Sequence, residues 1–101
     1  MAMAAVSIYP VGESVSLSKY VAATQRVLEQ QDRVRHQLGP MFTTLEGDID
    51  DIFAVIRQMQ EAVFAMGARR VSTTIKMDDR RDKAITMEGK VEAVRSHLRQ
   101  G

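Results

Sequence analysis

The chain has 101 residues, of which 45% are hydrophobic and 27% charged, so it is long enough for one compact domain and too short for two. Its 14 Lys and Arg residues nearly balance 13 Asp and Glu residues, and a net charge of +1 gives no electrostatic reason to expect a nucleic-acid or polyanion binder. The absence of cysteine excludes disulfides, thiolate–metal sites and cysteine nucleophiles, and it favours a cytoplasmic protein. We expect residues 1–101 to form a single domain.

Charge is distributed unevenly along the chain. Residues 1–68 hold 5 basic and 8 acidic side chains, whereas residues 69–101 hold 9 basic and 5 acidic ones. The two parts can therefore attract each other, within one chain or between subunits. The apolar N-terminus has no basic n-region and is soon interrupted by Ser7, Tyr9 and Pro10, so it predicts a strand and no signal peptide or membrane span.

The first half of the chain predicts a strand, a helix and two further strands. Residues 4–9 are a short β-branched segment that ends at Pro10, because proline cannot donate to a ladder. Serines 14, 16 and 18 offer N-caps for a helix, and the helical spacing that follows is carried by Leu17, Tyr20, Val21, Thr24, Val27 and Leu28. Residues 34–38 and 41–46 alternate in polarity on either side of Gly39 and Pro40, which predicts two tightly joined strands.

The second half predicts a helix, a strand and a last helix. After Asp48 the clearest apolar stripe in the chain keeps a 3.6-residue period as far as Met66, and Gly67 stands where a left-handed residue would end the helix. Residues 69–77 alternate as a strand, with one face formed by Val71, Thr73, Ile75 and Met77 and the other by Ser72, Thr74 and Lys76. The charged segment 78–83 predicts a loop. Thr86 is a plausible cap for a helix whose thin apolar face, Val91, Val94 and Leu98, requires a partner surface.

The order β-α-β-β-α-β-α, combined with the right-handed crossover rule, predicts an α+β fold, a ferredoxin-like sandwich with an extra C-terminal helix. Two helices would cover one face of a four-stranded antiparallel sheet. Tyr9, Phe42, Thr44 and Thr74 are candidates for the other face, and a partly apolar open face predicts self-association or a ligand at an interface.

Candidate chemistry in the sequence is sparse. We find no nucleophile–base–acid set, phosphate loop or zinc spacing, so we expect no catalytic residue, metal or cofactor. His36 and His97 have no second histidine at metal-ligand spacing, and we interpret them as a strand residue and a helix-end residue. Arg80 and Arg81 are either an anion site or part of a self-neutralised loop that serves assembly.

Paired threonines at 43–44 and 73–74 place hydroxyls on both faces of the predicted sheet, although threonine is also simply a good strand residue. Glu46 is the best-placed acid for a cationic ligand, but an acid before a Gly-Asp turn is ordinarily exposed. The spacing of these residues does not decide whether the threonines or Glu46 contact a ligand.

Several segments together resemble the small thiamine-binding-protein family of the YkoF-like superfamily. They are residues 10–12 (PVG), 16–21 (SLSKYV), 39–47 (GPMFTTLEG), 61–64 (EAVF) and above all 70–83 (RVSTTIKMDDRRDK). The resemblance covers nearly the whole chain. It implies a ferredoxin-like fold, tetramers built as dimers of dimers, and binding of thiamine or its hydroxymethylpyrimidine part without catalysis.

The resemblance also implies ligand-pocket residues. Ser18, Thr43 and Thr74 would supply a polar edge for the aminopyrimidine, Glu46 a charge for the thiazolium, and Tyr9 or Phe42 an aromatic wall. Phe42 departs from the family pattern, in which a small residue is commoner, and this ring would narrow the pocket or replace another stacking group.

Other function classes remain as alternatives. One is a structural or regulatory homo-oligomer of domains like those that sense amino acids, with a different ligand; Arg80 and Arg81 would then serve assembly. RNA binding is disfavoured, because only Tyr9 and Phe42 are candidate stacking rings and the basic-aromatic consensus of RNA-recognition modules is missing. An enzyme is disfavoured further, because no proton-transfer pair is evident beyond isolated Glu46 or His36.

Overall fold

The computed structural model describes residues 1–12 and 15–100, which form four strands and three helices in the predicted order. In chain order they are β1 (Ala2–Pro10), α1 (Ser18–Glu29), β2 (Arg35–Leu38), β3 (Thr43–Gly47), α2 (Ile49–Phe64), β4 (Val71–Asp79) and α3 (Met87–Gln100).

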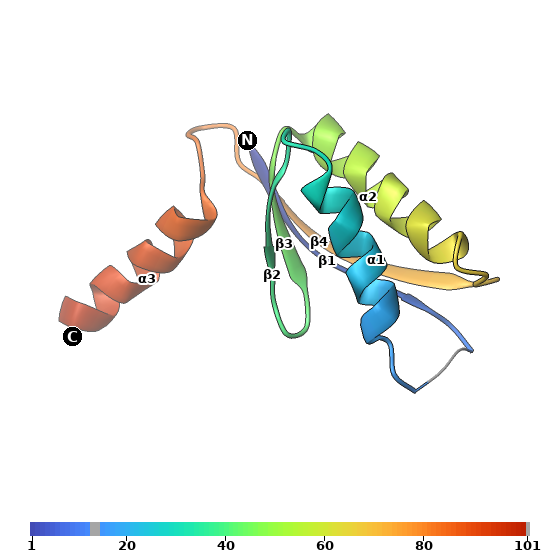
Figure 1. The fold of residues 1–101 in the computed structure, drawn as a ribbon. Coiled ribbons are helices and arrows are strands. Elements are labelled where there is room, and N and C mark those ends of the chain that lie inside the picture. The colour runs from blue at the N-terminus through green and yellow to red at the C-terminus, as the bar shows by residue number, and fades with distance from the viewer. Residues whose placement is uncertain (13–14, 101) are drawn as a thin grey trace.

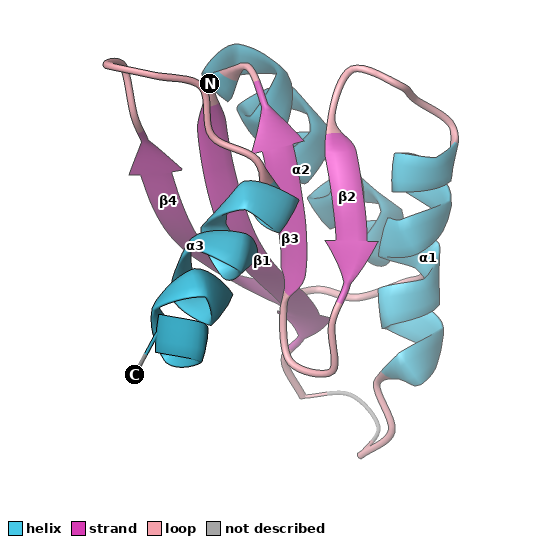
Figure 2. Ribbon diagram, turned by 90° about the vertical axis from the view of Figure 1, so that its left-hand side faces the viewer, coloured by secondary structure: helices cyan, strands magenta, loops and turns pink. Residues whose placement is uncertain are grey.

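The strands form one antiparallel sheet in the order β2-β3-β1-β4, so β1 lies inside the sheet and β4 at one edge. Helices α1 and α2 cover one face, and α3 lies on the opposite side of the sheet and projects away from it (Figures 1 and 2). The predicted ferredoxin-like sandwich with a C-terminal helix is thus confirmed.

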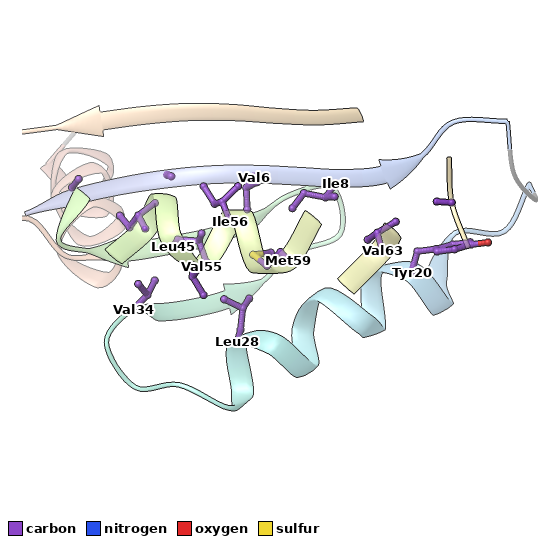
Figure 3. Close-up of a cluster of buried hydrophobic side chains, with 14 residues drawn as sticks. Val6, Ile8, Tyr20, Leu28, Val34, Leu45, Val55, Ile56, Met59 and Val63 are labelled. Carbon is purple, nitrogen blue, oxygen red and sulfur yellow. The ribbon is translucent and has the colours of Figure 1, made fainter. Parts of the chain in front are cut away.

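The core lies between the sheet and the two covering helices (Figure 3). Alternate residues of β1 point into it, and the register pairs Ala4 with Leu45 on the same face. The side chains of Leu28, Leu45 and Ile52 are fully buried, and each contributes about 1.5–3 kcal/mol by leaving water.

Local chemistry sets the ends of α2. The carboxylate of Asp48 accepts a hydrogen bond from the backbone N–H of Asp50 at 2.9 Å, which caps the helix. Gly67 has φ of 101°, the left-handed conformation predicted for the end of this helix. At α1 the N-cap position is occupied by Leu17, which has no side-chain cap, and Ser18 is already helical. Ser14 lies outside the described residues.

Several strand and helix boundaries differ by one or two residues from the sequence-based expectation, and the ends of β4 and β3 affect the predicted site. Strand β4 continues through Asp78 and Asp79, which were predicted to begin a loop, because both residues pair with β1 opposite Met3 and Ala2. Strand β3 begins at Thr43, so Phe42 belongs to the hairpin connection. The prediction that Phe42 lies on the open sheet face is wrong, because this residue lines a cavity on the helix-covered side with Val21 and Thr24.

Helix α3 begins as predicted and makes few contacts with the rest of the chain. The hydroxyl of Thr86 accepts a hydrogen bond from the backbone N–H of Gly89 at 2.9 Å. Met87 forms a small second apolar cluster with Met3 and Ile85. Beyond this anchor the apolar face is open to solvent, and Val94 is 60% and Leu98 73% exposed.

Candidate functional site

We call the sheet face opposite α1 and α2 the outer face. The register and the two-residue alternation of strands place its residues. They are Arg35 and Gln37 of β2, Thr44 and Glu46 of β3, Met3, Ala5, Ser7 and Tyr9 of β1, and Ser72, Thr74, Lys76 and Asp78 of β4. The predicted division of β4 into two faces is confirmed, and Tyr9, Thr44 and Thr74 lie on the open face as expected.

Glu46 is the most constrained polar residue of the outer face. Its side chain is 2% exposed, because the start of α3 covers it. Oε1 accepts a hydrogen bond from the backbone N–H of Met87 at 2.7 Å, and Oε2 accepts one from Nη1 of Arg35 at 2.7 Å. Both oxygens are therefore engaged within the chain, and Glu46 joins β3 to β2 and to α3.

Arg35 links this buried carboxylate to a second one on α3. Its Nη2 donates to Glu88 at 2.7 Å, and its Nη1 donates to the other Glu88 oxygen at 3.1 Å. Hydrogen bonds from Glu88 and Glu46 raise the pKa of Arg35, and Arg35 in turn holds the pKa of Glu88 below its ordinary value. One guanidinium thus ties the first turn of α3 to the sheet.

Two adjoining grooves, which share Gln37, Met87 and Val91, lie between α3 and the outer face; together we call them the α3 groove. The first has a volume of about 270 Å³ and is also lined by Met3 and Thr44. The second has a volume of about 490 Å³ and is also lined by Glu88, Glu92 and Arg95.

The lining of the α3 groove combines three kinds of chemistry. Methionine and valine side chains give an apolar wall, and Gln37 and Thr44 supply hydrogen-bond donors and acceptors. The charged lining has both signs: Lys90 and Arg95 lie beside Glu88 and Glu92, and these carboxylates pair with Arg35 and Arg99. A flat heteroaromatic ring with a polar edge matches the apolar and hydrogen-bonding part of this lining.

Phe42 and Thr43 line a different cavity, on the helix-covered side of the β2–β3 hairpin. Its volume is about 70 Å³, well below the roughly 300–1,000 Å³ of ordinary ligand pockets. The Thr43 hydroxyl, predicted as a ligand contact, accepts a hydrogen bond from Nε2 of Gln25 at 2.9 Å.

The other predicted pocket residues lie apart from these two cavities. Tyr9 is 39% exposed on the outer face, and Thr74 is its diagonal neighbour, because the register pairs Tyr9 with Ser72 and Ser7 with Thr74. Ser18 is exposed at the start of α1. A single chain therefore brings Tyr9 close to Thr74 and Phe42 close to Thr43, but it does not assemble all six predicted residues.

The arginines of the charged loop are paired with neighbouring acids. Arg80 donates two hydrogen bonds to Asp82, at 2.5 and 2.8 Å, and Arg81 donates to Asp79 at 3.0 Å. The hydrogen bond from Arg80 lowers the pKa of Asp82 to about 2. This is the self-neutralised arrangement that the sequence analysis weighed against an anion site.

The two histidines lie on separate elements, β2 and α3. His36 lies on the helix-covered face of β2, opposite Leu45, and His97 is exposed on α3. Across residues 1–12 and 15–100 no group of three acidic or histidine side chains is arranged to hold a metal ion.

The grouping of Gln37, Met87 and Val91 around the α3 groove was not predicted from the sequence, nor was the role of Arg35 in holding α3 to the sheet. The alternation of residues 34–38 does contain a signal, because it places Arg35 and Gln37 on one face of a strand. No sequence pattern indicates that α3 lies over that face, since the contact joins segments about fifty positions apart.

Comparison with known proteins gives a consistent family assignment. A family model described as "Thiamine-binding protein" matches residues 4–95. The UPF0045 protein YqgV of Bacillus subtilis is 48% identical over 102 residues, an alignment that covers 97% of this chain and 98% of YqgV.

Solved structures share the fold. The hypothetical protein MJ1052 of Methanocaldococcus jannaschii matches with a TM-score of 0.84 and 35% identity, covering 92% of this chain and 94% of that one. A Thermotoga maritima protein described as a proposed thiamine biosynthesis/salvage protein matches with a TM-score of 0.75, covering 92% of this chain and 97% of its own; at 19% identity that likeness concerns the fold alone. Among the described residues no helix is long and apolar enough to cross a membrane.

Proposed function

Because the chain belongs to the thiamine-binding protein family, we propose that it binds thiamine or its hydroxymethylpyrimidine part in the cytoplasm and does not catalyse a reaction. The observation that carries the proposal is the α3 groove, where an apolar wall, an amide and a hydroxyl lie together.

Each part of thiamine has a counterpart in the groove. The aminopyrimidine has a donor–acceptor edge that Gln37 and Thr44 can satisfy, and its ring can lie against Met87 and Val91. The thiazolium carries a permanent positive charge, which lies beside Glu92 in the outer part of the groove by competing with Arg99, the ion-pair partner of Glu92. Glu46 acts in this proposal as a positioning residue, because its oxygens hold Met87 and Arg35 in place.

We further propose that the groove is completed at a subunit interface of a homotetramer. The open apolar face of α3 continues past the groove to Val94 and Leu98, and exposed apolar side chains of this kind favour burial against another surface. Thr74 and Tyr9, which lie outside the groove within one chain, then become candidates for contacts made across an interface.

A second candidate function is a structural or regulatory homo-oligomer that binds a different small molecule. The exposed stripe of Val91, Val94 and Leu98 favours it, because assembly explains this stripe without thiamine.

The deciding experiment is calorimetric titration of ligand-free protein with thiamine, thiamine diphosphate and hydroxymethylpyrimidine. We expect saturable thiamine binding near one molecule per chain. Gln37→Ala should weaken both thiamine and hydroxymethylpyrimidine about 5- to 30-fold, because a buried hydrogen bond to the pyrimidine is lost.

The matched control is Gln58→Ala, which removes the same side chain from the exposed surface of α2 and should leave affinity unchanged. Equal affinities for the Gln37 and Gln58 variants would contradict the α3 groove as the site. Folded, oligomeric protein that releases no heat with any of the three compounds would favour the second candidate function.

A further inference from the structure

Strand β4 offers a long unpaired edge. It pairs along all nine of its residues with β1 and has no strand on its other side within the described chain (Figure 2). The carbonyl of Arg70 accepts a hydrogen bond from the N–H of Val11 at 2.8 Å, so the even-numbered residues here direct their backbone groups toward β1. The odd-numbered residues, from Val71 to Asp79, direct theirs to the open edge, where they can pair with a further strand.

We propose that this edge pairs with β4 of a second copy of the chain, antiparallel and with Thr74 opposite Thr74, so that two sheets join into one. The proposal specifies one interface of the homo-oligomer included in the proposed function. It does not require thiamine binding.

Geometry limits the possible registers. An antiparallel pair related by a two-fold axis must place residues of equal parity opposite each other, because only alternate residues direct backbone groups outward. The axis therefore passes through a pair formed by one residue and its own copy, and near the middle of β4 the choices are Thr73, Thr74 and Ile75.

Charge distinguishes these registers. With Thr74 on the axis, Arg70 lies opposite the partner's Asp78, and Arg69 lies opposite the partner's Asp79. With Ile75 on the axis, Arg70 would face Arg80 of the partner subunit. With Thr73 on the axis, Arg70 would face Lys76 of the partner subunit. Only the Thr74 register places opposite charges at both ends of the strand pair.

The charged groups are available for these contacts. The guanidinium groups of Arg69 and Arg70 have no hydrogen-bond or ion-pair partner within residues 1–12 and 15–100. Asp78 accepts from Lys90 and Asp79 from Arg81, in each case through Oδ2 alone. Each carboxylate therefore keeps Oδ1 for a further donor.

An apolar surface beside the edge of β4 also favours pairing with a second copy of the chain. Ile75, on the helix-covered face of β4, is 37% exposed, although its neighbours in the core are buried. Ala54 and Gln58, on one flank of α2, line a groove with the end of α1. Phe53 and Phe64 are exposed on the other flank of α2. The flank with the phenylalanines therefore faces the β4 side, where the proposed axis would bring α2 of the second copy.

Cysteine cross-linking tests the register, and the chain is suited to it because it contains no cysteine. In the Thr74 register the Thr74 pair is not hydrogen-bonded, so the two Cβ atoms come close enough for a disulfide. We expect Thr74→Cys to form a covalent dimer rapidly with oxidised glutathione, without added thiamine. Ser72→Cys should not, because its own copy lies about 13 Å away along the strand, whereas the double variant Ser72→Cys/Lys76→Cys should cross-link.

Charge reversal provides a second measurement. Arg70→Asp places like charges at two symmetry-related positions, so the dissociation constant of the β4 contact should rise at least 10-fold by sedimentation velocity. Adding Asp78→Arg should restore it to within about threefold, and Arg26→Asp on α1 should have no effect.

A cross-link at Ile75→Cys in place of Thr74→Cys, or an unchanged dissociation constant in Arg70→Asp, would overturn the proposal. These results are separable from the proposed function, because the cross-link is measured without thiamine and the titration uses the unmodified chain.

Discussion

Glu46 shows how much one residue contributes to the candidate site. Its buried carboxylate accepts from Met87 and Arg35, and so holds the first turn of α3 against the sheet. In Glu46→Gln the amide oxygen can still accept from Met87, but the NH₂ group cannot accept from Arg35. We expect the free energy of unfolding, measured with denaturant, to fall by about 1–3 kcal/mol.

Glu61→Gln is the control for that substitution. Glu61 is exposed on α2 and pairs with Arg57 one turn earlier at 3.7 Å, an interaction worth less than about 0.5 kcal/mol. Comparable losses of unfolding free energy in the two variants would show that the burial of Glu46 adds nothing to the stability of the protein.

At the scale of elements, two ion pairs join α3 to the sheet in addition to its small apolar anchor. Arg35 lowers the pKa of Glu88 below its ordinary 4.5, and Lys90 lowers the pKa of Asp78 below its ordinary 3.8. Both pKa values are lower in the folded protein than in the unfolded protein. The ion pairs therefore stabilise the fold fully above the ordinary pKa values, and this stabilisation is lost as pH falls through the lower pKa values of the folded protein.

We therefore expect α3 to detach from the sheet first in acid. Between pH 6 and pH 3, amides of residues 91–100 should lose protection from hydrogen exchange before those of α2, whose packing rests on buried side chains such as Ile56 and Met59. Simultaneous loss of protection in both helices would contradict this order. All rates are to be corrected for the intrinsic pH dependence of exchange.

At the scale of the whole molecule, the main core and the α3 anchor are separate clusters. The large cluster joins the sheet to α1 and α2, whereas the small one contains only Met3, Ile85 and Met87. We expect a chain that ends at Lys83 to keep a cooperative thermal transition by circular dichroism. It should lose thiamine binding, because α3 forms one wall of the groove.

Either of two results would contradict that prediction. An unfolded shortened chain would show that the fold depends on α3, and thiamine binding of unchanged affinity would place the ligand site elsewhere. The full chain, melted and titrated in parallel, is the reference for both measurements.

The fold was largely predictable, because its evidence is local. The register confirms the alternation along β4. The core contains most of the predicted stripe of α2, including Ile52 and Met59, whereas Phe53 and Met66 are exposed. Phe42 was misplaced, since alternation was extended across the turn that ends at Thr43. Strand β4 was predicted over residues 69–77, two residues too early at each end, because charge at Asp78 and Asp79 suggested a loop, although an edge strand tolerates charge.

The candidate site was less predictable. Glu46 was singled out as a ligand contact, but its partners within the chain were not anticipated, because Met87 is 41 positions away and meets it only through the path of α3. Thr43 and Thr74 were grouped by residue type, whereas the register places them on opposite faces.

The sequence by itself determined the strands and helices, their order and hence the topology, because backbone sterics and the periods of helices and strands act between near neighbours. Only the tertiary structure decided that Glu46 is buried under α3, that Gln37 and Val91 line one groove and that β4 is left as an open edge. Those outcomes depend on register and on long-range packing, in which residues far apart in the chain become neighbours.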